Sequence, residues 1–456
     1  ARTLDDSALI GKYNYALSFA SIFSVIIDFG LGPVLTREIA KNPHNEQDFL
    51  KKVLGLKIPL LVVALIAMWA TTAIIHLRKP FDLLDFQLLA VASVIIVLDS
   101  FTFTLFSVFR GRQILKYEAA GITIYQLIIV AAGSLFLFFR LPLYTLLLAI
   151  TLGSLFHFFY SLLLVVFSAN LRVRPVLDKA FILPTLKIAW PFAIAGIFFK
   201  LSGQVDTVML KVLAGDQYTG WYTIALKLTT ALTVLPGALA TSYFPAVSHY
   251  FVHDPKRVPY LFERAMLYLM IISLPISFGV YVIADEFVKI YGTAYGASAD
   301  ALKIFMVSLV FVFLNYPVGN LLNAANRQLL NTLNMGIALL INVGLNIFLI
   351  PRYTFMGASV AAAISSIVLL LLGLPHVYRK IHFRIGTLVK YLSQTILASL
   401  LMALTVAQLQ FTLPLPVIIL CGAILYFFIL MALGAIRTAD LRMIGDHFLR
   451  IARKFV

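Results

Sequence analysis

The sequence predicts an all-α, polytopic membrane protein with thirteen visible transmembrane helices. Of its 456 residues, 61% are hydrophobic and only 12% are charged, and the mean hydropathy is +0.96. A soluble protein cannot bury that much apolar surface, so the lipid bilayer must be the solvent. The apolar residues form long unbroken runs, which favours a helical bundle over the short alternating strands of a β-barrel.

Each apolar run is close to the roughly 20 residues that a helix needs to cross a bilayer. In chain order, the expected spans are 13–37, 52–76, 84–108, 117–139, 142–168, 186–212, 219–245, 262–284, 300–323, 329–350, 355–378, 387–408 and 413–435. The connections between them are all short. No segment is therefore expected to fold as a soluble catalytic domain.

The distribution of Lys and Arg predicts how the helices are oriented. With the loop from Arg37 to Lys52 placed in the cytoplasm, the inside loops carry about three times as many Lys and Arg residues as the outside loops. Contact with anionic headgroups therefore explains the net charge of +16, and no nucleic-acid partner is expected. We expect a multi-pass protein of the cytoplasmic (inner) membrane whose C-terminus is cytoplasmic.

The chain contains an internal repeat. The segment GKYNYALSFASIF from Gly11 aligns without a gap with GWYTIALKLTTAL from Gly220. A second pair of similar segments surrounds Arg112 and Arg327, each in a short predicted cytoplasmic turn. Six helices, an even number, separate equivalent positions. The two halves therefore run in the same direction across the membrane.

The repeat predicts the domain organisation. We expect a first lobe at 1–169, a basic cytoplasmic linker at 170–185, a second lobe at 186–380, and two further helices with a basic tail at 381–456. The tail from Arg437 suits an amphipathic helix, and a disordered tail is the alternative. The repeat partner of the 186–212 helix would precede Ala1, so we expect one first helix to be missing. The natural protein would then have fourteen helices, as two six-helix lobes plus two C-terminal helices.

Lysines inside the expected spans are candidate substrate contacts. Lys200 lies near the middle of its helix, and Gln204 shares its face one turn later. A lysine at that depth costs roughly 2.5–3.5 kcal/mol on insertion scales, so it should face a water-filled cavity or a partner. Lys57 and Lys227 lie nearer the ends of their helices. These four residues predict a cationic cavity for an anionic headgroup such as a diphosphate; snorkelling or structural pairing is the alternative for each lysine.

Three acids inside the spans are candidates for an ion pair or for coupling. Asp28 and Asp99 fall at a depth similar to that of Lys57 on neighbouring helices, so either carboxylate can pair with its ammonium. The pair would hold the first lobe together, or break when substrate or a proton binds. Asp206 lies on another face of the Lys200 helix. It is a candidate site for H⁺ or Na⁺ as a coupling ion, with pairing to a neighbour as the alternative.

Gly and Pro interrupt the helices at near-equivalent places in the two halves. The first break, FGLGP, contains Gly30, Gly32 and Pro33, and the second, LPGALA, contains Pro236 and Gly237. Such residues bend helices, so we predict hinges there for a rocking transporter, with plain packing of small residues as the alternative.

The sequence carries no motif for bond-making chemistry. The eight histidines are scattered without a third metal ligand, Cys421 is the single cysteine, and the P-loop pattern GxxxxGK[ST] is absent. We therefore expect no catalytic residues, no metal site, no direct ATP hydrolysis, and no cofactor apart from the coupling ion.

Several stretches together resemble the oligosaccharide and polysaccharide flippases of the multidrug/oligosaccharidyl-lipid/polysaccharide exporter superfamily. They cover most of the chain in family order and are IIDFGLGPVLTREIAK from Ile26, KLSGQVDTVMLKVLAG from Lys200, GWYTIALKLTTALTVLPGALATSYFPAVS from Gly220, IYGTAYGASADALKIF from Ile290, LLNAANRQ from Leu321 and NIFLIPRYTFMGASVAAAIS from Asn346. The resemblance implies fourteen helices in two six-helix lobes around a cationic central cavity. It also implies that a lipid-diphosphate-linked sugar moves from the inner to the outer leaflet by alternating access.

We therefore predict a flippase for lipid-diphosphate-linked oligosaccharides, such as an O-antigen, capsule or exopolysaccharide repeat unit on undecaprenyl diphosphate or a similar carrier. The alternatives within the superfamily are a lipid II flippase and a MATE-type drug/cation antiporter. A membrane glycosyltransferase or ligase would need larger outer loops, and a lipid-organising structural protein would leave the buried lysines unexplained. We expect a monomer, with association with polysaccharide assembly proteins left open.

Overall fold

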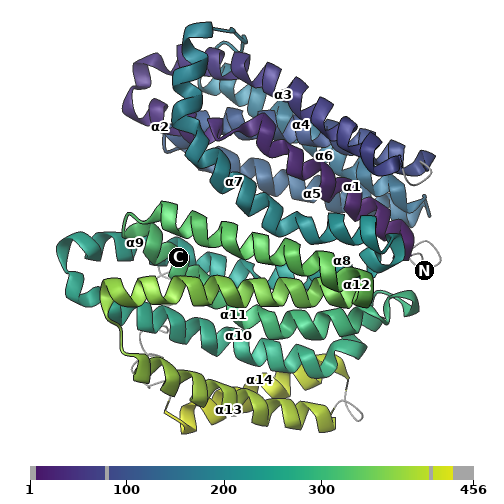
Figure 1. Cartoon of the computed structure of the whole chain (residues 1–456), viewed down its shortest axis with the longest axis vertical. Coiled ribbons are helices and arrows are strands. Elements are labelled where there is room, and N and C mark those ends of the chain that lie inside the picture. The colour runs from purple at the N-terminus through teal and green to yellow at the C-terminus, as the bar shows by residue number, and fades with distance from the viewer. Residues whose placement is uncertain (1–6, 78–81, 410–413, 435–456) are drawn as a thin grey trace, which may run out of the picture. The chain divides into compact units, whose positions relative to one another are not determined.

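The computed structural model describes residues 7–77, 82–409 and 414–434, and all regular secondary structure in this part of the chain is helical (Figure 1). The α-helices are α1 (Ser7–Asp28), α2 (Leu31–Lys41), α3 (Glu46–His76), α4 (Leu83–Gly111), α5 (Lys116–Phe138), α6 (Leu146–Leu163), α7 (Lys179–Leu213), α8 (Asp216–Leu232), α9 (Val234–His253), α10 (Val258–Lys289), α11 (Ser298–Ala324), α12 (Gln328–Ile381), α13 (Ile385–Leu409) and α14 (Leu415–Ala432). A π-helical turn, Leu164–Ser168, continues α6. The predicted amphipathic tail from residue 437 lies outside the described residues.

The chain divides into two compact units. The first contains Ala1–Thr223 and Val343–Ala358, and the second contains Ile224–Asn342 and Ser359–Val456. This division differs from the predicted lobe boundary at residue 186, because α7 packs against α1, α2 and α3 and so belongs with the first unit. The helix α7 also begins at Lys179, within the predicted linker 170–185.

The prediction of an all-α, polytopic membrane protein is confirmed, with a difference in the number of helical runs. Twelve runs among the described residues are long and apolar enough to cross a membrane, compared with thirteen predicted spans. The difference lies in α12, a single run of 54 residues that contains the predicted spans 329–350 and 355–378. A straight helix of that length would measure about 80 Å, whereas the hydrocarbon core is about 30 Å thick.

The helix α12 turns back on itself at Thr354, whose φ of 49° and ψ of −126° are not helical. A Cβ atom on Gly357 would lie 2.4 Å from the Leu349 carbonyl oxygen. The Ser365 hydroxyl donates a hydrogen bond of 3.1 Å to the Ala338 carbonyl oxygen. Residues so far apart in sequence cannot touch along a straight helix. The two predicted spans are therefore the two arms of α12, and the fourteenth helix remains a prediction.

Both predicted Gly and Pro breaks lie where one helix ends and the next begins. Gly30 separates α1 from α2 with a φ of 70°, and a Cβ atom there would lie 2.5 Å from the Ala189 carbonyl oxygen. Only glycine fits both the left-handed backbone and the close approach of α7. Gly32 and Pro33 lie in the first turn of α2. Pro236 and Gly237 lie in the first turn of α9, after a milder break at Thr233. Motion at these breaks remains a prediction.

The internal repeat appears in the first unit as contacts between equivalent residues of α1 and α8. A Cβ atom on Gly11 would lie 2.0 Å from the Asp216 carbonyl oxygen, and one on Gly220 would lie 1.9 Å from the Ser7 carbonyl oxygen. Ser7 and Asp216 are themselves repeat partners, 209 residues apart. The Asn14 side chain donates to Thr223 Oγ1 at 3.0 Å, across the same separation. Each helix thus contacts the other through the same positions, a local two-fold arrangement.

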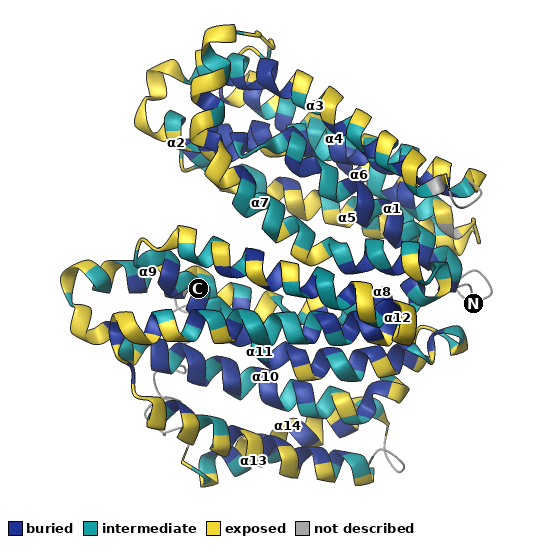
Figure 2. Cartoon of the chain, in the orientation of Figure 1, coloured by how far each residue is buried: buried dark blue, intermediate teal, exposed yellow. Residues whose placement is uncertain are grey.

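Apolar side chains cover the outer faces of several helices. Figure 2 shows exposed residues along much of α3 and α13. On α3 these include Val62, Val63 and Ile66, and on α13 they include Leu401 and Leu404. Exposed apolar surface of this extent on long helices is expected where lipid is the solvent.

Candidate functional site

A buried lysine joins three helices of the first unit. Lys57 of α3 has no exposed side-chain surface, and its Nζ atom lies 2.9 Å from Asp28 Oδ1 at the end of α1. The same ammonium donates to two atoms of α4: the Ser100 carbonyl oxygen and Thr104 Oγ1, both at 2.5 Å. The Ser100 hydroxyl also donates to Asp28 Oδ1. The three donors of the ammonium are therefore all used.

This geometry separates the two acids that the sequence offered as partners. Lys57 pairs with Asp28, and its remaining bonds go to Ser100 and Thr104 rather than to Asp99. A saturated ammonium has no donor left for a substrate phosphate in this conformation. A role for Lys57 in binding would require the Asp28 pair to open first.

Asp99 lies one residue before Ser100 on α4, yet it faces a different environment. Ser154 of α6 lies beside it, and the opposite charge that acts on its carboxylate is Lys200 of α7. Asp99 is half-buried. The structure therefore distributes the two predicted acids between two lysines, Asp28 to Lys57 and Asp99 to the neighbourhood of Lys200.

Unlike Lys57, Lys200 has an ammonium that is available to bind a ligand. It lies thirteen residues before the end of α7, or about 20 Å along the helix. Its side chain is half-buried, and among the described residues it forms no salt bridge within 4 Å. Gln204, one turn further along α7, is also half-buried. An ammonium deep in a membrane helix without a close counter-ion favours a charged ligand as its partner.

A buried carboxylate with neutral donors lies further along α7. Asp206 is 7% exposed, and its Oδ2 accepts a hydrogen bond of 2.9 Å from the Tyr222 hydroxyl of α8. The Asn346 amide of α12 donates to Oδ1 at 2.5 Å. Tyr222 and Asn346 are both buried. This arrangement surrounds a carboxylate with oxygen and amide groups, the ligand types that suit a hard monovalent cation or a proton.

The sequence missed an ion network at one end of the first unit. The Lys211 ammonium of α7 lies 3.0 Å from both carboxylate oxygens of Asp85 on α4 and 2.6 Å from Asp216 Oδ1 on α8. It also lies 4.9 Å from the centre of the Tyr15 ring of α1. Asp85 and Lys211 are both buried. Lys211 lies at the outer end of the predicted span 186–212, where a lysine needs no partner, and Asp85 is 126 residues away in the sequence.

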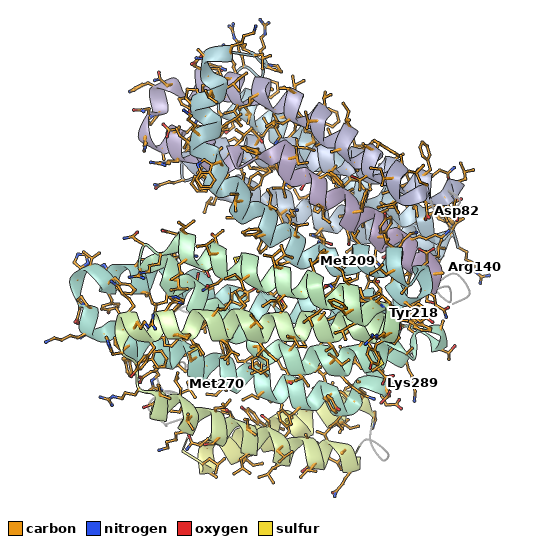
Figure 3. All side chains as sticks on the ribbon, viewed as in Figure 1. Asp82, Arg140, Met209, Tyr218, Met270 and Lys289 are labelled. Atoms are coloured by element: carbon orange, nitrogen blue, oxygen red, sulfur yellow. The ribbon has the colours of Figure 1, made fainter. Side chains whose placement is uncertain are left out.

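Lys12 of α1 extends this network towards its exposed edge. Its ammonium lies 3.9 Å from Asp85 and hydrogen-bonds Asp82, which caps α4. The bond from Lys12, together with the Leu84 N–H, holds the pKa of the Asp82 carboxyl below its usual value. Asp82 and Arg140 lie at the same end of the first unit (Figure 3), as expected if both follow outside connections.

The remaining predicted cation, Lys227 of α8, falls in the second unit and is exposed there. Lys303 of α11, also within a predicted span, forms a salt bridge of 2.8 Å with the exposed Asp285. It is therefore a surface residue of little energetic weight. Among the described residues, no group of three His, Cys, Asp or Glu side chains is placed to hold a metal ion.

The linker ahead of α7 is tied to α3 on the predicted cytoplasmic side. Lys52 of α3 lies 3.2 Å from Asp178, which caps α7, and the Gln47 side chain accepts a hydrogen bond from the Arg172 backbone. The Lys52 ammonium is the main reason that the pKa of the Asp178 carboxyl lies below its usual value. These contacts fix the point at which the chain enters α7, the helix that carries Lys200 and Asp206.

Two family models match the sequence. The model of the family described as "Polysaccharide biosynthesis protein" matches residues 1–251, and the MatE model matches residues 191–348. Among known proteins, the chain is similar to the probable low-salt glycan biosynthesis flippase Agl15 of Haloferax volcanii, with 24% identity over 175 residues. That match covers 38% of this chain and 36% of the relative, so the chain spans little more than a third of it.

Solved structures with the same fold come from two kinds of transporter. The lipid II flippase MurJ, in an inward closed conformation, aligns with a TM-score of 0.73 and 16% identity, covering 95% of this chain and 97% of that chain. An inward-facing multidrug resistance MATE family transporter of the MOP superfamily aligns with a TM-score of 0.67 and 12% identity, covering 84% and 95%. At such low identity the likeness shows the fold alone, a MurJ/MATE-like helical fold.

Proposed function

Because the chain belongs to the polysaccharide biosynthesis protein family, we propose that it is a flippase for a lipid-diphosphate-linked oligosaccharide, such as an O-antigen, capsule or exopolysaccharide repeat unit. It moves this substrate across the cytoplasmic membrane by alternating access and makes no covalent bonds. The observation that carries the proposal is Lys200, a half-buried ammonium deep in α7 without a salt bridge to any described residue.

The headgroup chemistry supports this assignment. A diphosphate is too highly charged to enter a low-dielectric region unless a fixed cation meets it there. Lys200 supplies that cation, and Gln204 can donate to a phosphate or sugar oxygen from the same helix face. Asp99 of α4 is the described acid whose charge acts on Lys200, and it forms no salt bridge with it.

The Lys57 ammonium fits the role of a second cation for the substrate, one that becomes available only when its pair with Asp28 opens. Its bonds to Asp28, Ser100 and Thr104 hold α1, α3 and α4 together. Asp28 is the last residue of α1 and lies two residues before Gly30, where the helix breaks. A movement of α2 at that break would pull on Asp28 and free the ammonium for the travelling diphosphate. We propose this coupling between the Gly30 hinge and Lys57.

Asp206 is the proposed coupling site. Its carboxylate, with the Tyr222 hydroxyl and the Asn346 amide, can bind Na⁺ or take up H⁺. Either cation would neutralise a buried charge and let α7, α8 and α12 rearrange together. An imposed gradient of the coupling ion would then drive the transport cycle.

A drug/cation antiporter is the second candidate, because the MatE model matches residues 191–348. A cationic drug needs an accessible carboxylate. Asp28 is already paired with Lys57, Asp206 is buried between two donors, and Asp99 lies beside Ser154 and near the positive charge of Lys200. The available charged group is instead the ammonium of Lys200, which favours an anionic substrate.

Replacing Lys200 with Ala tests the proposed binding role. We expect export of the glycan to fall at least tenfold, because the loss of a hydrogen bond to a charged group costs about 1.5–3 kcal/mol. Lys200→Arg should retain most of the export. The measurement is the amount of surface glycan in a host that lacks its own copy of the gene. Lys303→Ala, which removes a half-buried lysine that is already paired with Asp285, is the matched control. Normal export by Lys200→Ala at normal protein abundance would refute the role.

Replacing Asp206 with Asn tests the proposed coupling role. We expect transport in proteoliposomes to lose its response to an imposed gradient, because an amide can neither take up a proton nor balance a sodium ion. Tyr222→Phe should weaken the response without abolishing it. Separate pH and Na⁺ gradients identify the ion. If Asp206→Asn responded to both gradients like the unmodified protein, the coupling site would lie elsewhere.

A further inference from the structure

The second unit contains an apolar groove that the proposed transport role does not use. Its volume is about 780 Å³, within the range of about 300–1,000 Å³ typical of ligand sites. Four helices line it: α10, α11, the second arm of α12, and α13. Met270, labelled in Figure 3, contributes from α10, Val310 and Leu314 from α11, Leu371 from α12, and Val389 from α13.

Apart from Tyr378 at one end and Ser277, the residues that line the groove are all apolar. The Ser277 hydroxyl, which lines it, already donates to the Met306 carbonyl oxygen at 2.6 Å. Leu371 and Val389 are 62% and 58% exposed, so the groove opens to the surroundings of the unit. An occupant must therefore be a long, apolar chain, and lipid chains surround these helices in the membrane.

One end of the groove lies at the connection between α12 and α13, where four cations gather. Tyr378, Phe383, Ile385 and Val389 line this end. Arg379 and Lys380 end α12, Arg384 lies in the connection, and Lys390 lies on the second turn of α13. All four are exposed, and none forms a salt bridge with a described residue. They lie on the predicted cytoplasmic side.

Among the described residues, none of these four cations forms a salt bridge with an acid. No Asp or Glu occurs in the sequence between Asp300 and Asp440. The neighbouring acid on α10, Glu263, is buried, and it accepts a hydrogen bond of 2.7 Å from the Arg384 backbone N–H. A preference for positive cytoplasmic loops explains cations on this side. It does not explain why four cations without a salt bridge to a described residue gather at the mouth of an apolar groove.

The connection has a defined shape. His382 ends α12 in the left-handed conformation, with a φ of 49°. The next residue, Phe383, is buried, and its ring packs against Phe262 of α10 and Tyr378 of α12. With the Glu263 bond to Arg384, these contacts hold the connection against α10. The cationic corner and the end of the groove are therefore fixed beside each other.

From this juxtaposition we propose that the second unit binds an anionic phospholipid of the inner leaflet. The phosphate lies among Arg379, Lys380, Arg384 and Lys390, and one acyl chain lies in the groove between α10, α11, α12 and α13. This lipid is a resident of the site rather than the transported substrate. The proposal rests on the membrane setting and is independent of the substrate that Lys200 handles.

The test uses purified full-length protein, stripped of lipid in excess detergent and incubated with equal amounts of phosphatidylglycerol and phosphatidylcholine that carry the same acyl chains. Bound lipid is counted by native mass spectrometry. We expect the protein to retain phosphatidylglycerol at least about tenfold better than phosphatidylcholine. Arg379→Gln/Lys380→Gln and Arg384→Gln/Lys390→Gln should each reduce this preference, and the two pairs combined should abolish it.

A matched set of cations provides the electrostatic control. Arg37, Arg172, Arg174 and Lys179 are four exposed basic residues of the first unit on the same predicted side. Their replacement by Gln removes the same charge and should leave the preference intact. If both sets of variants lost the preference for phosphatidylglycerol equally, the preference would come from general attraction to a basic surface. That result would overturn the proposed site. Thermal unfolding of each variant in the same detergent identifies variants that fail to fold.

A second pair of variants tests the groove itself. Leu371→Trp fills the groove, whereas Leu404→Trp adds the same bulk to an exposed position of α13 outside it. We expect Leu371→Trp alone to reduce retention of phosphatidylglycerol. Retention that is unchanged by Leu371→Trp would refute the acyl-chain position. A polyprenyl lipid recovered with the protein, and lost in Leu371→Trp, would place the substrate chain in the groove and would also overturn the proposal.

Glycan export separates this inference from the proposed function. Lys200→Ala should stop export and leave phosphatidylglycerol binding intact. Loss of lipid binding in Lys200→Ala would show that the two sites are one, and would refute a resident lipid.

Discussion

Asp28→Asn is expected to lower the free energy of unfolding by about 3–5 kcal/mol, because it leaves a buried ammonium without its counter-ion. The Lys57 side chain has no exposed surface, so water cannot replace the lost carboxylate. Lys57→Met should cost less. It leaves Asp28, which is 26% exposed and can be hydrated. The double variant Asp28→Asn/Lys57→Met should recover much of the stability of the unmodified protein, because neither charge is then left alone.

The measurement is unfolding of the detergent-solubilised protein by a denaturing detergent, followed by circular dichroism. Asp285→Asn is the matched control. It removes the carboxylate of an exposed salt bridge with Lys303, which is worth about 0–1 kcal/mol. If Asp28→Asn lowered the free energy of unfolding no more than Asp285→Asn does, the Lys57 pair would not hold α1 and α4 to α3.

Lys211→Met is expected to destabilise the protein by a similar amount, about 3–5 kcal/mol, for the opposite electrostatic reason. Its removal leaves the buried Asp85 carboxylate and that of Asp216 without the cation that lies between them. Lys12, at 3.9 Å from Asp85, compensates only in part. The contact of the ammonium with the Tyr15 ring is lost as well.

Unfolding measured in the same way distinguishes this network from a surface pair. Lys211→Met/Asp85→Asn should recover stability, since the deepest unpaired charge is then removed. Lys289→Met, which breaks an exposed pair with Glu286, is the control and should change the free energy of unfolding by less than about 1 kcal/mol. A double variant less stable than Lys211→Met alone would mean that the Asp85 carboxylate is stabilised by other groups.

The sequence predicted the fold class because hydrophobicity is a property of composition and local order. Long apolar runs mark membrane helices wherever they occur, and nearly every predicted span lies on one observed helix or helix pair. The helix breaks at Gly30 and near Pro236 were also predictable, since the backbone conformations that Gly and Pro favour depend on the residue itself. The reversal at Thr354 was predicted only as a gap between two spans. Pro351 and Gly357 flank it, but the residue with the non-helical backbone is a threonine.

The sequence by itself determined that ionisable groups lie within membrane helices, and that each must therefore have a partner or a ligand. It placed Lys57 near two acids, because depth along a helix follows from residue number. The choice between Asp28 and Asp99 depended on which faces of α1, α3 and α4 meet. The Asp85–Lys211 and Asp206–Asn346 contacts join residues 126 and 140 positions apart. Only the tertiary structure decided these pairs, because the packing of helices distant in sequence sets which side chains come within reach, and no local pattern encodes it.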